Sequence, residues 1–299
     1  MALLIITTIL WAFSFSLIGE YLAGSVDSYF SVLMRVGLAA LVFLPFLRTR
    51  GQSPRTIVLY MLVGAMQLGI MYLLAFRAYI YLTVSEFLLF TVFTPLYITL
   101  IYDLLSGRKL RWGYLLSAVL AVLGAAIIRY DKVSDHFWTG LLLVQLSNLC
   151  FAIGMVGYKR LMEVRPMPQH NAFAWFYVGA FIVAVAAWFM LGNAQKLPTT
   201  TLQWSVLVWL GVVASGLGYF MWNYGATQVD AGTLGIMNNV HVPAGLLVNL
   251  AIWQEQPHWP SFISGALVIL ASLWVHRRWV APHSGQTAGD RRRGSAQSE

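Results

Sequence analysis

Charged residues are scarce in this chain. Asp, Glu, Lys and Arg together make up 10% of its 299 residues, and hydrophobic residues make up 59%. A soluble domain usually has about 25% charged residues. The mean hydropathy is +0.70. This composition excludes an ordinary soluble domain and indicates a protein embedded in a membrane.

Sequence signatures of catalysis and metal binding are also missing. The single cysteine, Cys150, lies in an apolar run and excludes an internal disulfide. Neither a Gly-x-x-x-x-Gly-Lys phosphate loop nor a His-Glu-x-x-His zinc motif occurs. The net charge of +8 is spread between apolar runs instead of forming a basic patch. We therefore expect a protein that is not an enzyme, with no cofactor, no metal and no nucleic-acid partner.

Long apolar runs occupy most of the chain. A membrane-spanning helix needs about 20 apolar residues, and most of the runs reach that length. The sequence predicts an all-α integral membrane protein with ten transmembrane helices. They are Leu3–Leu22, Ser28–Leu47, Thr56–Tyr79, Thr83–Tyr102, Trp112–Ile128, Trp138–Tyr158, Ala172–Met190, Leu202–Thr227, Gly232–Trp253 and Pro260–Val275.

The basic residues predict how these helices are oriented. With the N-terminus in the cytoplasm, fourteen of the 19 Lys and Arg residues fall on the cytoplasmic side, four fall outside, and Arg35 lies inside a span. Cytoplasmic connections of membrane proteins carry such an excess of Lys and Arg. Both termini are therefore predicted to be cytoplasmic.

Two central spans contain a proline at matching places, Pro95 and Pro243, which are 148 residues apart. A proline leaves a helix carbonyl without its donor, and in a membrane such breaks mark the binding sites of transporters built from repeats. Five helices per half give two repeats of opposite orientation. We predict a first repeat at residues 1–130, a second at 137–280, and a disordered cytoplasmic tail at 281–299.

Local motifs then give a family resemblance. Trp11–Phe15 in the first span, Arg35 in the second and Gly265–Ile269 in the last, with the two proline-containing helices, resemble the EamA-type branch of the drug/metabolite transporter superfamily. Including Phe173–Tyr177 and Gly235–His241, the chain is similar to the biotin importers of that branch. The resemblance implies a secondary transporter that takes up biotin across the inner membrane by alternating access. Composition and periodicity name no substrate.

Arg35 is the charged residue placed most clearly inside a span. Its planar fork suits a substrate carboxylate, which it would bind through two parallel hydrogen bonds. The alternative is a structural arginine that pairs with a carboxylate of the protein or with carbonyls freed near Pro95.

The ninth span concentrates polar side chains just before Pro243, namely Asn238, Asn239 and His241. Asn238 and His241 share a helix face, whereas Asn239 points elsewhere. Amide and imidazole groups there could meet a polar ring such as a urea, or they could join neighbouring helices by hydrogen bonds.

Other residues at similar depth complete the candidate site. The predicted substrate-binding residues on other spans are Gln67, Tyr72, Thr94, Asn148, Trp222 and Asn223. Arg77 and Glu86 lie near the outer ends of the third and fourth spans and either pair with each other or guard the entrance. In the second case Glu86 could carry a coupling proton.

Three rival functions are open at this level: an exporter of amino acids or related metabolites, a membrane enzyme acting on lipid or isoprenoid, and a structural subunit. Small residues spaced by four, Ser117, Ala121 and Ala125, predict close helix packing within the bundle or in a homodimer.

Overall fold

The apolar runs form long helices. The computed structural model describes residues 2–105 and 135–229 without interruption, and only part of the chain between 106 and 134 and between 230 and 274. Seven helices in the described residues are long and apolar enough to cross a membrane. They cover Ala2–Tyr21, Ser28–Phe46, Pro54–Ala78, Val84–Leu105, His136–Val164, Gln169–Leu191 and Thr201–Thr227. The predicted all-α membrane fold is confirmed, since those residues contain no strand.

Four of the seven spans are single helices, or nearly so. They are α1 (Ala2–Tyr21), α2 (Ser28–Phe43, continued by a 3-10 turn at Leu44–Phe46), α8 (Asp135–Val164) and α9 (Gln169–Leu191). Helix α8 continues six residues beyond the predicted end at Tyr158, and Arg160 and Glu163 form an ion pair of 2.8 Å on this charged extension. A count of apolar residues cannot detect such a charged extension.

The other three spans are interrupted helices. The third consists of α3 (Pro54–Gly64), the π-helical segment η2 (Ala65–Ile70) and α4 (Met71–Ala78). The fourth consists of α5 (Val84–Phe90), a 3-10 turn η3 (Thr91–Phe93) and α6 (Thr94–Leu105). The eighth repeats the pattern of the third with α10 (Thr201–Trp209), the π-helical segment η6 (Leu210–Leu217) and α11 (Gly218–Thr227).

Side-chain caps fix several helix starts. Ser53 accepts a hydrogen bond from the backbone N–H of Thr56, so α3 begins at Pro54, two residues before the predicted start at Thr56. Asp27 caps α2 in the same way. Thr83 and Glu86 form a capping box at the start of α5.

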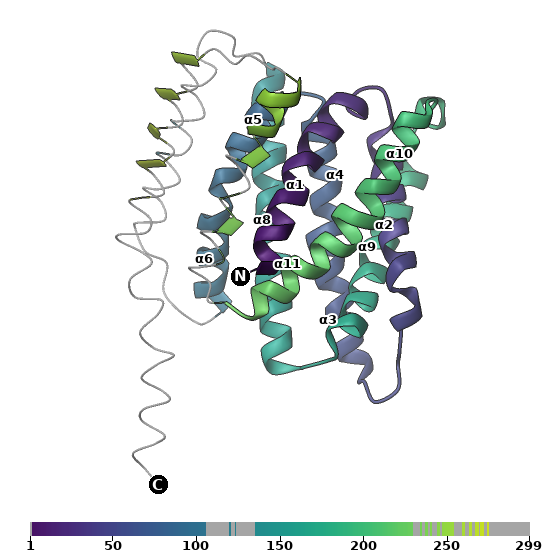
Figure 1. The fold of residues 1–299 in the computed structure, drawn as a ribbon. Coiled ribbons are helices and arrows are strands. Elements are labelled where there is room, and N and C mark those ends of the chain that lie inside the picture. Colours follow the sequence, from purple (N-terminus) through teal and green to yellow (C-terminus); the bar gives the residue numbers. More distant parts are fainter. Residues whose placement is uncertain are drawn as a thin grey trace.

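The helices pack as one bundle, in which α9 lies against α2 and α3 (Figure 1). Hydrogen bonds tie the helix ends together on one side: Tyr60 Oη donates to the carbonyl of Arg165, and Lys159 Nζ donates to the carbonyls of Ala226 and Val229. Basic residues predict that this side is cytoplasmic. On the opposite side, the N–H of Asp27 donates to the carbonyl of Lys196.

Two helix contacts match the predicted repeat. Helix α1 packs against α11, and α8 packs against α4. A shift of about 140 to 148 residues relates α1 to α8 and the third span to the eighth, so these two contacts would be equivalent. The π-helical segments η2 and η6 also lie at equivalent places. The repeat boundaries at 130 and 137 stay a prediction.

Several predictions fall wholly or partly outside the described residues. They include most of the span at 112–128 with its small residues Ser117, Ala121 and Ala125, nearly half of the positions in the spans at 232–253 and 260–275, the residues Asn239, His241 and Pro243, and the tail at 281–299.

Candidate functional site

A cavity lies between the helices of the two halves. Most of the residues that line it are apolar or aromatic. The lining residues are Trp11, Ser14, Phe15, Ile18, Arg35, Met71, Tyr72, Ala75, Phe76, Tyr79, Phe87, Thr91, Thr94, Ser147, Asn148, Phe151, Tyr219 and Asn238.

Arg35, on α2, supplies the positive charge of this lining and is 3% exposed. Its Nε donates to Ser215 Oγ at 2.5 Å, and its guanidinium carbon lies 4.2 Å from the centre of the Tyr72 ring. No carboxylate of the described residues forms an ion pair with Arg35. An arginine within a membrane is costly unless it is paired or solvated. The carboxylate partner considered for a structural arginine is therefore not found in the described part of the chain.

Ser215 holds Arg35 and Tyr72 in place together. Its Oγ lies 2.8 Å from Tyr72 Oη, and its backbone carbonyl accepts a hydrogen bond from Tyr177 Oη at 2.5 Å. Ser215 belongs to η6, where the helix is locally widened. Its position therefore depends on a distortion that periodicity does not predict.

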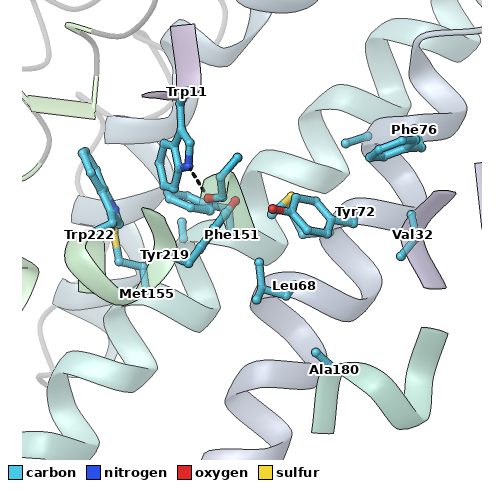
Figure 2. Packing of buried hydrophobic residues seen from close by; sticks show 14 of the residues in the cluster. Trp11, Val32, Leu68, Tyr72, Phe76, Phe151, Met155, Ala180, Tyr219 and Trp222 are labelled. Carbon is cyan, nitrogen blue, oxygen red and sulfur yellow. Dashed lines mark hydrogen bonds between the residues drawn. The ribbon is translucent and has the colours of Figure 1, made fainter. Parts of the chain in front are cut away.

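Aromatic rings from equivalent positions of the two halves form the walls (Figure 2). Trp11 and Phe151 lie with ring centroids 6.4 Å apart, and Tyr72 and Tyr219 lie 5.8 Å apart, both pairs edge to face. Trp11 Nε1 donates to the carbonyl of Ala214, which fixes the orientation of its ring. Flat aromatic walls of this kind suit a ligand with an apolar ring system.

The helix departs from α geometry just before Pro95. Pro95 has no N–H to donate to the carbonyl of Thr91, and that carbonyl instead accepts hydrogen bonds from the backbone N–H and from Oγ1 of Thr94. Asn148 Nδ2 donates to the carbonyl of Phe90 at 3.0 Å. Thr94 and Asn148 thus line the cavity and also donate hydrogen bonds to backbone carbonyls at the break in the helix.

Asn238 lies against the cavity from the partly described segment after residue 230. It is 1% exposed, and its Nδ2 has no hydrogen-bond partner in the part of the chain that the structure describes. A buried donor without a partner costs about 1–3 kcal/mol.

Gln67, Trp222 and Asn223 lie beside the cavity and not in its lining. The amides of Gln67 and Asn223 exchange two hydrogen bonds of 3.0 Å, and both side chains are fully buried. Each is four or five residues further toward the predicted cytoplasmic side than Tyr219 or Tyr72, about 6–8 Å along its helix. Trp222 Nε1 donates to Met155 Sδ (Figure 2). These residues close the cavity on that side.

The predicted gate residues also lie outside the lining. The guanidinium carbon of Arg77 lies 6.0 Å from the centre of the Tyr29 ring. Glu86 accepts a hydrogen bond from the backbone N–H of Thr83 at 2.9 Å and is 7% exposed. A role of either residue in gating or proton coupling stays a prediction.

The chain matches the model of the EamA-like transporter family over residues 1–130 and again over 138–277. The chain belongs to this family. It is 83% identical to the biotin transporter of Escherichia coli (strain K12) over the full length of both proteins. It is 55% identical to the probable biotin transporter of Pseudomonas aeruginosa, over 93% of this chain and 97% of that protein. A solved crystal structure aligns with a TM-score of 0.65 over 92% of this chain and 95% of that one, at 17% identity, and so shares the fold.

As an EamA-like transporter with seven described apolar spans, the protein is a multi-pass protein of the bacterial inner membrane. Of its predicted substrate-binding residues, the structure brings together Arg35, Tyr72, Thr94, Asn148 and Asn238 at one cavity. Among residues 2–105, 135–229 and the other described positions, no three His, Cys, Asp or Glu side chains form a candidate metal site.

Sequence reasoning missed part of this EamA-family site. Tyr79 and Tyr219 line the cavity, and Ser215 orients Arg35, yet none of the three was a candidate. The internal repeat offered a signal for one of them, because a shift of 147 residues places Tyr72 on Tyr219. Nothing comparable marks Ser215 or Tyr79.

Proposed function

We propose that the protein is a secondary transporter that imports biotin across the bacterial inner membrane by alternating access. The observation that carries this proposal is Arg35, a buried cation without a carboxylate partner among the described residues, beside a largely aromatic cavity. The identity of the proposed substrate comes from the relatives named as biotin transporters.

The chemistry of biotin fits this cavity. Biotin has a carboxylate at the end of an aliphatic chain and a fused bicyclic ring system at the other end. The guanidinium of Arg35 binds the carboxylate, since its fork matches two carboxylate oxygens. The paired rings of Trp11, Phe151, Tyr72 and Tyr219 enclose the apolar parts of the molecule.

The closure on the predicted cytoplasmic side supports alternating access. In this conformation the Gln67–Asn223 amide pair lies between the cavity and that side. Release into the cytoplasm requires the two halves to separate there, so both hydrogen bonds break and the π-helical segments η2 and η6 move apart.

Uptake of labelled biotin tests the proposal. Cells without other biotin uptake that express the protein should accumulate biotin well above an empty-vector control, and excess unlabelled biotin should abolish the signal. The measurement is cell-associated label over time, with and without a protonophore. Accumulation equal to the empty vector, with the protein present in the membrane, would exclude biotin import.

Export of an amino acid is the competing function, and a probable terminal-alkyne amino-acid exporter of Streptantibioticus cattleyicolor is 20% identical over 92% of this chain. An amino acid carries an ammonium group as well as a carboxylate. The described residues that line the cavity include no Asp or Glu to pair with an ammonium group. The cavity therefore favours a substrate with a single negative charge.

Replacing Glu86 with glutamine tests proton coupling. Glutamine also forms a capping box, so α5 should stay intact. We expect Glu86→Gln to retain exchange of labelled for unlabelled biotin but to lose accumulation driven by the proton gradient. Right-side-out vesicles with an imposed pH gradient measure both. Unchanged gradient-driven accumulation would exclude Glu86 as the proton carrier.

A further inference from the structure

The neutral polar groups that line the cavity are nearly all committed to the protein itself. The hydroxyls of Ser14, Thr91, Thr94 and Ser147 donate to the backbone carbonyls of Leu10, Leu88, Thr91 and Met71, respectively. The amide nitrogen of Asn148 donates to the carbonyl of Phe90. None of these donors is available to a ligand without breaking an existing hydrogen bond.

Two neutral donors of the lining have no partner in the described part of the chain: Asn238 Nδ2 and Tyr79 Oη. Tyr79 lies at the end of the helix face that carries Tyr72 and Phe76, because residues i, i+4 and i+7 align. Arg35 lies over the rings of Tyr72 and Phe76, at 4.2 Å and 5.9 Å. Tyr79 therefore belongs to the wall that carries the positive charge.

Asn238 belongs to a different, uncharged wall. Asn249 Nδ2 donates to Ser85 Oγ, and the position of a Cβ on Gly245 would lie 2.9 Å from Leu88 Cδ2. Gly245 and Asn249 thus pack against α5 in the antiparallel sense. Asn238 lines the cavity together with Thr94, the residue before Pro95.

The cavity therefore offers a cation on one wall and a free amide donor on another. A substrate that satisfies both must carry an anionic group and, in a separate part of the molecule, a neutral acceptor oxygen. We propose that Asn238 donates a hydrogen bond to the carbonyl oxygen of a cyclic urea and is the residue that selects the ureido ring of the substrate. This inference rests on the proposed function of biotin transport.

Competition with an analogue that lacks the acceptor tests this role. In 2-iminobiotin a cyclic guanidine, cationic at neutral pH, replaces the urea, while the carboxylate and the rest of the molecule are unchanged. The wild-type protein should prefer biotin over 2-iminobiotin by at least about tenfold, because a site built to donate to an oxygen rejects a ligand that lacks it.

Asn238→Asp should reverse that preference. A carboxylate at this position repels the urea oxygen and pairs with the cyclic guanidinium, so the ratio of inhibition constants should shift toward 2-iminobiotin by more than about tenfold. The measurement is inhibition of labelled-biotin exchange by each analogue, normalised to the amount of protein in the membrane. Asn238→Ala, which removes the donor without adding charge, should reduce the preference for biotin, and the preference that remains reflects the lack of an acidic lining residue to pair with the cyclic guanidinium.

Asn223→Asp is the matched control. It makes the same chemical change at a fully buried asparagine that is not in the cavity lining, so total uptake can fall while the ratio stays at the wild-type value. The proposal would be overturned if the ratio of the inhibition constants of biotin and 2-iminobiotin stayed at the wild-type value in Asn238→Ala. The same holds for Asn238→Asp where that variant reaches the membrane. That result leaves biotin transport intact, whereas a wild-type protein that accumulates no biotin would overturn the proposed function instead.

Discussion

Replacing Arg35 with leucine should lower the affinity for biotin by about thirtyfold or more. Truncating one partner of a buried, hydrogen-bonded charge pair costs about 2–5 kcal/mol, and every 1.4 kcal/mol is about tenfold in affinity. Biotinamide, in which a neutral amide replaces the carboxylate, should bind the variant with nearly the same affinity as the wild type, because it forms no ion pair with Arg35. Inhibition of labelled-biotin exchange by each compound measures the two affinities.

Two further variants sharpen this comparison. Arg35→Lys keeps the charge but loses the fork and the hydrogen bond from Nε to Ser215, so its affinity for biotin should be intermediate. Arg77→Leu removes an arginine outside the cavity lining and should affect biotin and biotinamide alike. Equal losses for the two ligands in Arg35→Leu would mean that Arg35 has a structural role and does not bind the carboxylate.

Replacing Gly64 or Gly179 with alanine should destabilise the whole bundle. The two glycines bring α3 and α9 into backbone contact: a Cβ on Gly64 would lie 1.9 Å from the carbonyl oxygen of Phe176, and a Cβ on Gly179 would lie 1.9 Å from that of Met61. Overpacking costs about 1–3 kcal/mol when side chains can yield. Here the obstacle is backbone, so we expect a larger loss and little folded protein.

The melting temperature in detergent and the yield of monodisperse protein measure this effect. Gly157→Ala is the control, because its Cβ would meet only the Val63 side chain, at 3.2 Å from Cγ2, and that side chain can move. Wild-type stability in both Gly64→Ala and Gly179→Ala would show that the two helices can separate at no cost.

Helix positions could be predicted because the membrane sets a length that apolar runs must meet. All seven apolar spans of the described residues were predicted, and Pro95 marked the departure from α geometry in the fourth. The π-helical segments η2 and η6 were not predicted, since no proline or other breaker of that strength marks them.

The candidate site was predictable only in part. Arg35 stood out because a charge within a span is costly and needs a reason. Gln67 and Asn223 looked equally suited to bind a ligand, yet their amides bond to each other beside the cavity. A sequence lists the polar groups of a helix, but the rotation of that helix against its neighbours decides which ones meet.

By itself, the sequence determined that this protein is a bundle of membrane-spanning helices with a buried arginine, because hydrocarbon excludes charge and unpaired backbone from its interior. Only the tertiary structure decided that Arg35 shares a cavity with Asn238 and with the rings of Tyr72 and Tyr219. The reason is that these residues come from different helices, whose spacing and rotation depend on contacts such as those of Gly64 and Gly179.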